Sequence, residues 1–330
     1  MTTQTIAEIG MNHDGSLGNA CKMMEAAHEA GADIVKFQTH IAEAETTKDA
    51  PMPPYFKGEK RFDYFKRTAF TKDQWGILRD RCKTLGVSFM SSPFSVEAVE
   101  LLEDVGVEYY KVPSGEVTNL PLLREIAKTG KPVFISSGMS NWSELDEAVA
   151  EILKLNNKLT VMQCTSEYPC DYAVVGLNVM QEMKERYRLP VGFSDHTLTN
   201  YASFAATVLG ASVIERHFTL SHRLYGSDAR HSLEPEQFSE MVQGIRAIEL
   251  MLGHRIDKNQ IDSFAEMKTV FQKSVVALQE IPAGSIIVPR MLAIKKPGTG
   301  IPPKYIENVI GKKARKTIRP DQVIFWEDVE

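Results

Sequence analysis

Eight short apolar runs recur along the chain, and each ends in a small cluster of polar or charged residues. Each run is rich in apolar and β-branched residues and is too short for a helix, which is typical of a buried parallel strand. Stretches with helical spacing separate the runs. Eight such units predict a (β/α)8 TIM barrel, an enzyme fold whose active site lies at the C-terminal ends of the strands. The runs span residues 5–10, 33–38, 86–92, 108–116, 131–139, 159–168, 189–196 and 212–218.

The chain has 330 residues, more than the roughly 250 of a bare barrel, so a second module is expected. We predict the barrel at residues 1–253 and a linker with a short helix at 254–272. Residues 273–330 change to short strands with Pro-Ala-Gly and Pro-Gly turns, which indicates a small, mostly β domain. A domain of this size buries a small core, so we expect it to dock on its own barrel or on a partner subunit.

Composition excludes several classes of function. The net charge of −5 gives no attraction for nucleic acid or for an anionic membrane surface. The N-terminal residues lack the apolar region of a secretory signal, and no apolar run approaches the ~20 residues of a membrane helix. The cysteines Cys21, Cys82, Cys164 and Cys170 form no CxxC pair and no zinc-like spacing. We therefore expect free thiols in a reducing, cytoplasmic protein.

One connection is much longer than the others. Residues 39–69 follow the second predicted strand and contain Pro51, Pro53 and Pro54 together with several aromatic residues. Connections of this length in a compact domain usually have a function or are partly disordered. Two interpretations stay open: a cover over the substrate, and a packing flap without a part in catalysis.

The first predicted strand contains a carboxylate that points to function. Glu8 lies within the apolar run, where an ionised carboxylate is costly unless it is paired or bound to a cation. Asn12 and His13 follow at the end of the same strand, and a histidine in such a loop is often an ordinary helix-start residue. Glu8 is therefore the candidate functional residue of this segment.

Two lysines occupy comparable positions on the second and fourth predicted strands. Lys36 and Lys111 face inward into the site or reach outward between helices, and outward snorkelling is common for a single lysine. Hydroxyl side chains accompany them on neighbouring strand ends. Convergent ammonium and hydroxyl groups at this end of a barrel suit a phosphate or carboxylate ligand. The hydroxyl groups belong to Ser92, Ser114, Ser136 and Ser194.

Two histidines end adjacent predicted strands. His196 follows the seventh strand and His217 the eighth, with Glu8 next around the closed barrel. Two imidazoles and a nearby carboxylate would suit Mn, Fe, Co or Zn. Asp228 lies in the polar loop after the eighth strand, where a substrate contact and a capping turn are equally good interpretations.

The motifs taken together resemble the sialic acid (nonulosonic acid) synthase family, and residues 273–330 resemble the antifreeze-like (SAF, β-clip) domain attached to it. The resemblance covers almost the whole chain in order. The motifs are AEIGMNHDG (7–15), VKFQ (35–38), SPFS (92–95), YYKVPSGE (109–116), ISSGM (135–139), CTSEYP (164–169), GFSDHT (192–197), ERHFT (215–219), GSD with SLEP (226–235) and KKPGTGI (295–301).

The resemblance implies that phosphoenolpyruvate condenses with the open-chain aldehyde of an N-acetylmannosamine-type sugar, giving N-acetylneuraminate or a close analogue and phosphate. It implies a divalent metal on His196 and His217, Mn²⁺ first with Mg²⁺ or Co²⁺ as alternatives, and Glu8 as general base or as the group that orients water. It also implies a domain-swapped homodimer in which the C-terminal module covers the partner's site. The anion would be held by Lys36, Lys111, Ser92, Ser114, Ser136 and Ser194, and the sugar by Glu116, Ser166, Tyr168, Asp228 and Lys296.

Two departures from the family's motifs bear on the sugar. Some members have Asn where this chain has Ser166, and many have Arg where it has Lys296. Legionaminate or pseudaminate synthesis from a 2,4-diacetamido-trideoxy sugar is therefore an alternative. A Schiff-base aldolase using Lys111 or Lys36 is a second alternative, and it would need a lysine of depressed pKa. A carbohydrate-binding protein without catalysis is a third, which the set of catalytic-type residues disfavours.

Overall fold

The computed structural model describes residues 2–52, 56 and 58–330, so Pro53 and Pro54 of the long connection lie outside the described residues. The chain divides into two compact units, Met1–His254 and Arg255–Glu330. Residues 255–272, within the predicted linker, are counted with the second unit. Each unit is described by itself.

The first unit is a closed barrel of parallel strands in the order β1 to β8, which confirms the predicted TIM barrel. β1 pairs with both β2 and β8 and so closes the sheet on itself. Each of the eight predicted runs overlaps one strand. The strands are β1 (Gln4–Gly10), β2 (Ile34–Thr39), β3 (Ser88–Pro93), β4 (Tyr109–Val112), β5 (Val133–Ser136), β6 (Leu159–Cys164), β7 (Val191–Asp195) and β8 (Val213–His217).

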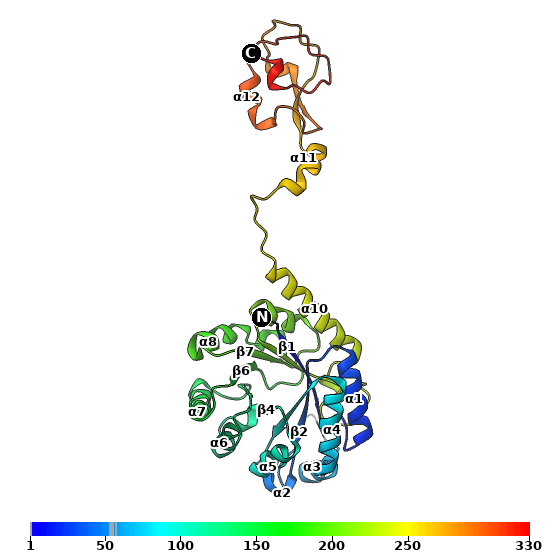
Figure 1. Ribbon diagram of the computed structural model, residues 1–330, viewed down its shortest axis with the longest axis vertical. Coiled ribbons are helices and arrows are strands. Elements are labelled where there is room, and N and C mark those ends of the chain that lie inside the picture. The colour runs from blue at the N-terminus through cyan, green and yellow to red at the C-terminus, as the bar shows by residue number, and fades with distance from the viewer. Residues whose placement is uncertain (1, 53–55, 57) are drawn as a thin grey trace. The chain divides into compact units, whose positions relative to one another are not determined.

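Helices surround these strands (Figure 1). Their ends follow local sequence signals: Thr71 caps α4 through a reciprocal capping box with Gln74, and Gly86 ends it at a φ of 76°, which glycine tolerates best. The helices are α1 (Leu17–Glu29), α2 (Ala42–Glu45), α3 (Arg61–Thr68), α4 (Lys72–Leu85), α5 (Val96–Val105), α6 (Leu120–Lys128), α7 (Trp142–Leu153), α8 (Leu177–Tyr187), α9 (Tyr201–Val208) and α10 (Pro235–Gly253), with short 3-10 turns η1 (Ser114–Glu116), η2 (Tyr172–Val174) and η3 (Ala229–His231).

The period-two alternation of the strands determines which side chains enter the barrel. Residues that face outward, such as Val35 and Phe37 of β2, join the core between sheet and helices. Inside the barrel, a layer of apolar side chains fills the end where the strands begin. The interior positions nearer the strand ends are polar instead, so the alternation delivers the functional groups to one face. The apolar layer consists of Ile6, Ile34, Met90, Phe134, Met162 and Val213.

The second unit has its own small core, in keeping with the predicted β module. Strand β9 (Ser274–Ala277) pairs antiparallel with β10 (Leu292–Lys295), and further isolated bridges extend the pairing. α11 (Ala265–Phe271) joins this unit through a hydrogen bond from Gly298 N to Thr269 O of 2.8 Å. The remaining elements are η4 (Asp262–Phe264), η5 (Pro289–Met291), η6 (Pro303–Tyr305), α12 (Ile306–Val309) and η7 (Trp326–Asp328).

Two further expectations concern cysteines and membranes. Cys21, Cys82, Cys164 and Cys170 are all free thiols. Across residues 2–52, 56 and 58–330, no helix combines the length and the apolar character that crossing a bilayer requires.

Candidate active site

Lys36 of β2 and Lys111 of β4 both point into the barrel and are 3% and 2% exposed. Their ammonium groups converge on one carboxylate oxygen: Lys36 Nζ lies 2.9 Å and Lys111 Nζ 3.0 Å from Glu215 Oε1. Neither lysine reaches outward between helices, so the snorkelling interpretation is wrong. The interior thus holds two buried cations against one shared carboxylate.

Glu215 is a site residue that the sequence reasoning missed. It lies on β8 two positions before His217 and also accepts from Ser194 Oγ at 3.2 Å. Burial acts to raise its pKa, but the two ammonium groups outweigh burial and hold the pKa of Glu215 well below its usual value. The signal that singled out Glu8, a carboxylate within an apolar strand, applies equally to SVIERHF and could have found Glu215.

The hydroxyl groups predicted around the lysines divide into two kinds. Ser92 and Ser136 are buried, and their Oγ atoms have no hydrogen-bond partner among the described residues. Ser194 is held by Glu215, and Ser114 Oγ accepts from Gly138 N at 3.0 Å. A buried hydroxyl without a partner is costly, so Ser92 and Ser136 are the two groups that a bound anion would satisfy.

Ser166 lies beside Ser114. A Cβ atom added to Gly138 would overlap Ser166 Oγ and would lie 2.7 Å from Ser114 Oγ, so both hydroxyls border the same glycine. Because Gly138 has no side chain, the turns after β4, β5 and β6 approach one another closely at this point. Ser166, which was predicted to bind the sugar, therefore lies beside Ser114, which was predicted to bind the anion.

Glu8 is 1% exposed and accepts a hydrogen bond from Gln38 Nε2 at 2.7 Å on its Oε1 atom. Its Oε2 atom lies 3.5 Å from Lys36 Nζ. Burial, with the Glu215 charge adding to it, raises the pKa of Glu8 to about 7 against the opposing effects of Lys36 and Gln38. A carboxyl group poised near neutral pH is suited to proton transfer.

His196 and His217 lie close together at the ends of β7 and β8, with ring centroids 5.6 Å apart. His196 Nδ1 lies 2.9 Å from the Thr165 carbonyl oxygen, which fixes a proton on Nδ1. Burial lowers the pKa of His217 to about 4, so its ring is neutral at neutral pH. His217 Nδ1 has no hydrogen-bond partner within the described part of the chain, and it lies 3.8 Å from Asp228 Oδ2.

These two imidazoles fit a divalent metal in donor chemistry. Within the described residues, no three His, Cys, Asp or Glu side chains gather into a metal-binding group. Glu8 contacts Gln38 and Lys36, so the facial arrangement of two histidines and this carboxylate is not formed. A metal here would take His196 and His217 as protein ligands and fill its remaining positions with water or substrate.

Tyr168 and Asp228 lie beside the histidines. The Tyr168 ring is 4.2 Å from the His196 ring and 6.0 Å from the His217 ring, centroid to centroid. Asp228, His217 and Tyr168 line one cavity of about 150 Å³. Glu116 of η1 accepts from Asn119 Nδ2 at 2.8 Å, and burial raises its pKa. Asp228 stands at the N-cap position of η3, where its carbonyl oxygen accepts from His231 N at 3.0 Å, while its side chain makes no cap hydrogen bond and lines the cavity.

The long connection forms one wall of the same cavity. His40, Met52, Arg61, Tyr64 and Phe65 come from it, and Met11, Gln38, Phe94 and Ser227 complete the lining. Arg67 fastens the connection to the loop after β1, with Nη2 2.7 Å from Asp14 Oδ1. The structure therefore favours the interpretation of residues 39–69 as a cover over this part of the barrel.

Three other residues that the sequence analysis named are His13, Asn12 and Lys296. The first two make packing and hydrogen-bond contacts, and the third lies in the second unit. His13 stacks on Phe70 at 4.4 Å, and its Nδ1 accepts from Gly15 N. Asn12 Nδ2 donates to Phe218 O and to Ser232 Oγ. Lys296 belongs to the second unit, where its Nζ lies 5.0 Å from the Phe271 ring centroid.

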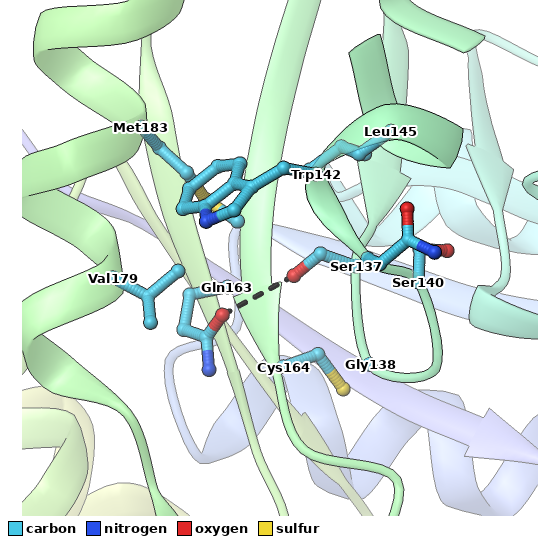
Figure 2. A pocket seen from close by; sticks show the side chains of 10 residues that line it. Ser137, Gly138, Ser140, Trp142, Leu145, Gln163, Cys164, Val179 and Met183 are labelled. Carbon is cyan, nitrogen blue, oxygen red and sulfur yellow. Dashed lines mark hydrogen bonds between the residues drawn. The ribbon is translucent and has the colours of Figure 1, made fainter. Parts of the chain in front are cut away.

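A second cavity, of about 310 Å³, opens between α7 and α8 beside β6 (Figure 2). Its lining includes the Trp142 and Met183 side chains. The polar groups at its base already have partners, because Ser137 Oγ bonds to Gln163 Oε1 at 3.2 Å and Gln163 Nε2 donates to Val175 O at 3.1 Å. We therefore place the candidate active site at the barrel interior.

Comparison with known proteins identifies the family to which the chain belongs. The NeuB family matches residues 23–257, and the SAF domain family matches residues 272–330. The N,N'-diacetyllegionaminic acid synthase of Campylobacter jejuni is 37% identical over 98% of this chain and 98% of its own length. The N-acetylneuraminate-9-phosphate synthase of Homo sapiens is 36% identical over 98% of this chain and 92% of its own length.

A more distant relative and a solved structure agree. The pseudaminic acid synthase of Helicobacter pylori is 30% identical over 98% of this chain and 97% of its own length. The crystal structure of the N-acetylneuraminic acid synthetase of Leptospira borgpetersenii in complex with citrate superposes with a TM-score of 0.71 at 30% identity, covering 81% of this chain and 90% of that one. The chain belongs to the NeuB family, the nonulosonic acid synthases, and carries a C-terminal SAF domain.

Proposed function

We propose that this protein condenses phosphoenolpyruvate with the open-chain aldehyde of an N-acetylated amino sugar, releasing phosphate. The observation that carries the proposal is a buried group at the same barrel end as His196 and His217. It consists of Lys36, Lys111 and the hydroxyls of Ser92 and Ser136, which have no hydrogen-bond partner among the described residues. Such a group can hold a multiply charged anion away from water.

The reaction makes one carbon–carbon bond and breaks one carbon–oxygen bond. C3 of phosphoenolpyruvate attacks the aldehyde carbon, and the aldehyde oxygen takes up a proton. Water then adds at C2 of the former phosphoenolpyruvate, and phosphate departs with the bridging oxygen to leave a 2-keto-3-deoxy acid. Lys36 and Lys111 would exchange their contacts with Glu215 for contacts with the anion, and Ser114 and Ser166 would extend that anion site.

Glu8 is the proposed general base for the attacking water. Its carboxylate lies in the barrel beside Lys36, and its pKa near 7 lets it accept a proton at neutral pH. Tyr168, Asp228 and Glu116 would contact the acceptor sugar, since Tyr168 and Asp228 line the cavity next to His217.

A divalent metal, Mn²⁺ first, is proposed on His196 and His217; when bound, it would polarise the aldehyde oxygen as a Lewis acid. Its binding can be measured directly by calorimetry with Mn²⁺. His217→Ala should abolish binding, whereas His28→Ala, which changes an exposed histidine on α1, should leave it unchanged. Retained stoichiometric binding in the His217 variant would contradict the ligand assignment.

The acceptor is proposed to be an N-acetylmannosamine-type sugar, and a 2,4-diacetamido-trideoxy sugar is the second candidate. The apolar side chains of Met11, Met52, Phe65 and Phe94 in the cavity wall would suit the additional methyl groups of the second candidate. The test is phosphate release from phosphoenolpyruvate with each sugar in turn and added Mn²⁺. Release with none of them would contradict the proposed condensation.

The Schiff-base alternative has one observation in its favour. Burial, assisted by the charge of Lys36, lowers the pKa of Lys111 against the effect of Glu215. The ion pair between Lys111 and Glu215 instead favours a role in anion binding. Borohydride trapping of a covalent substrate adduct would decide for the Schiff base, and loss of activity in EDTA with rescue by Mn²⁺ would decide against it.

The oligomeric state is also a proposal. We propose a homodimer in which the SAF domain of one chain serves the barrel of the other and brings Lys296 to the acceptor sugar. Light scattering of the purified protein gives the mass directly. A monomer that retains full activity would contradict this proposal.

A further inference from the structure

A chain of buried polar side chains runs from the long connection to Glu8. His40 Nδ1 lies 2.7 Å from Glu45 Oε1, and His40 Nε2 lies 3.2 Å from Gln38 Oε1. Gln38 Nε2 in turn donates to Glu8 Oε1 at 2.7 Å. The His40 and Glu45 side chains are 4% and 6% exposed, so solvent does not replace these contacts.

The His40 ring is held in place by two aromatic rings. Phe65 of α3 stacks on one face at a centroid distance of 3.8 Å and an interplanar angle of 7°. Phe94, which follows β3, covers the other face at 4.1 Å and 21°. A ring fixed on both faces presents its two nitrogen atoms in fixed directions, one toward Glu45 and one toward Gln38.

The donors and acceptors determine where the protons lie. An amide can turn either its oxygen or its nitrogen toward a neighbour. When Gln38 donates to the Glu8 carboxylate, its oxygen faces His40 Nε2, which must then carry a proton. His40 Nδ1 faces the Glu45 carboxylate at 2.7 Å, a distance that also requires a shared proton. The His40–Glu45 pair therefore holds its Nε2–H toward Gln38.

We propose that His40 and Glu45 are positioning residues that lock the Gln38 amide with its N–H group toward Glu8, and that this contact holds the Glu8 carboxylate in its reactive orientation. The inference rests on the proposed function, in which Glu8 is the general base. It gives the long connection a part in catalysis beyond covering the site, because Glu45 and Phe65 both belong to it. Neither His40 nor Glu45 needs to touch the reacting atoms.

The test separates hydrogen bonding from packing. His40→Phe keeps an aromatic ring between Phe65 and Phe94 but removes both nitrogen atoms. His40→Gln restores an N–H group near the place of Nε2. We expect His40→Phe to lower kcat about tenfold or more while the KM for phosphoenolpyruvate stays within about twofold, and His40→Gln to recover most of the loss. His28→Phe, on the exposed face of α1, is the matched control.

A double-mutant cycle with Gln38→Leu tests the route of the effect. If His40 acts through Gln38, His40→Phe should cause no further loss of kcat in the Gln38→Leu background. Independent losses that multiply, or a wild-type kcat in His40→Phe, would overturn the proposal. A raised KM for phosphoenolpyruvate without a change in kcat would overturn it as well.

A measurement without substrate separates this proposal from the proposed function. Hydrogen exchange of the Gln38 side-chain amide, followed by NMR, should be slow in the wild type, faster in His40→Phe and slow again in His40→Gln. If no acceptor is condensed, the proposed function is wrong, while this exchange pattern still supports the positioning of Gln38 by His40. If condensation proceeds but exchange is the same in all three proteins, the proposed positioning of Gln38 by His40 is wrong and the proposed function stands.

Discussion

Lys111 on β4 and Glu215 on β8 reach across the barrel interior and form a buried ion pair, with Lys111 Nζ 3.0 Å from Glu215 Oε1. Lys36 contacts the same oxygen atom, so a single carboxylate keeps two ammonium groups in place. A multiply charged anion can compete with Glu215 for both ammonium groups. Anion binding should therefore affect the stability of the protein.

Lys111→Ala should raise the KM for phosphoenolpyruvate by about tenfold to a hundredfold, because a hydrogen bond to a charged group contributes about 1.5–3 kcal/mol. The KM for the acceptor sugar should change little. Steady-state kinetics with each substrate varied in turn gives both constants. Lys128→Ala, which removes an exposed ammonium group on α6, is the control. A change confined to the sugar constant would place Lys111 at the acceptor instead.

Glu215→Gln keeps the shape of the side chain but leaves Lys111 without a compensating charge and Lys36 with only the Glu8 carboxyl group, 3.5 Å away. Breaking a buried ion pair from one side costs about 3–5 kcal/mol, so the free energy of unfolding should fall by that order. Inorganic phosphate should raise the melting temperature of the variant more than that of the wild type, because the anion replaces the lost carboxylate. Equal phosphate effects on both proteins would contradict this account of the lysines.

The pH dependence of catalysis should report Glu8. Its carboxyl group has a pKa of about 7 and must be ionised to act as a base, so kcat/KM should rise with pH up to about 7 and then level off. Glu8→Gln should lower activity and remove this limb of the profile. Glu29→Gln, at an exposed position of α1, should keep the wild-type profile. A profile that falls as pH rises through 7 would indicate an acid instead.

Asp195 and Arg216, which precede His196 and His217 in the sequence, form a buried ion pair whose contribution to stability can be measured. Arg216 Nη1 lies 2.6 Å from Asp195 Oδ2 and 2.7 Å from the Thr199 carbonyl oxygen, and both side chains are about fully buried. Asp195→Asn should lower the free energy of unfolding by about 3 kcal/mol or more in urea titrations. Asp146→Asn breaks a half-exposed pair with Arg186 and should cost under about 1 kcal/mol. Equal losses would show that burial of the Arg216 pair adds nothing.

The barrel was predictable because each strand is a buried run whose apolar character appears directly in the sequence. One rule found Lys36, Lys111 and Glu8: a charged residue within an apolar run is costly to bury unless it is paired or binds a ligand. The same rule applies to Glu215, but the neighbouring Arg216 and His217 make that run look like an ordinary polar strand end. The partnership of Lys36 with Glu215 joins residues 179 positions apart and exists only because β8 closes onto β1.

Gln38 and His40 could not be found by that rule. An amide carries no charge whose burial would raise suspicion, a histidine is not always charged, and both residues follow the apolar part of the second run. Their importance depends on the aromatic rings of Phe65 and Phe94, which come from different connections. The position of Ser166 beside Ser114 could not be predicted from the sequence either, because it depends on how closely the turn at Gly138 approaches both residues.

The proposed reaction consumes phosphoenolpyruvate by carbon–oxygen cleavage during condensation with an amino sugar. Phosphoenolpyruvate labelled with ¹⁸O at the bridging oxygen tests it directly, with the product phosphate observed by ³¹P NMR. We predict that, with an accepted sugar, the released phosphate keeps the label and a 2-keto-3-deoxy acid forms in equal amount. Unlabelled phosphate, or phosphate released without that acid, would contradict the account.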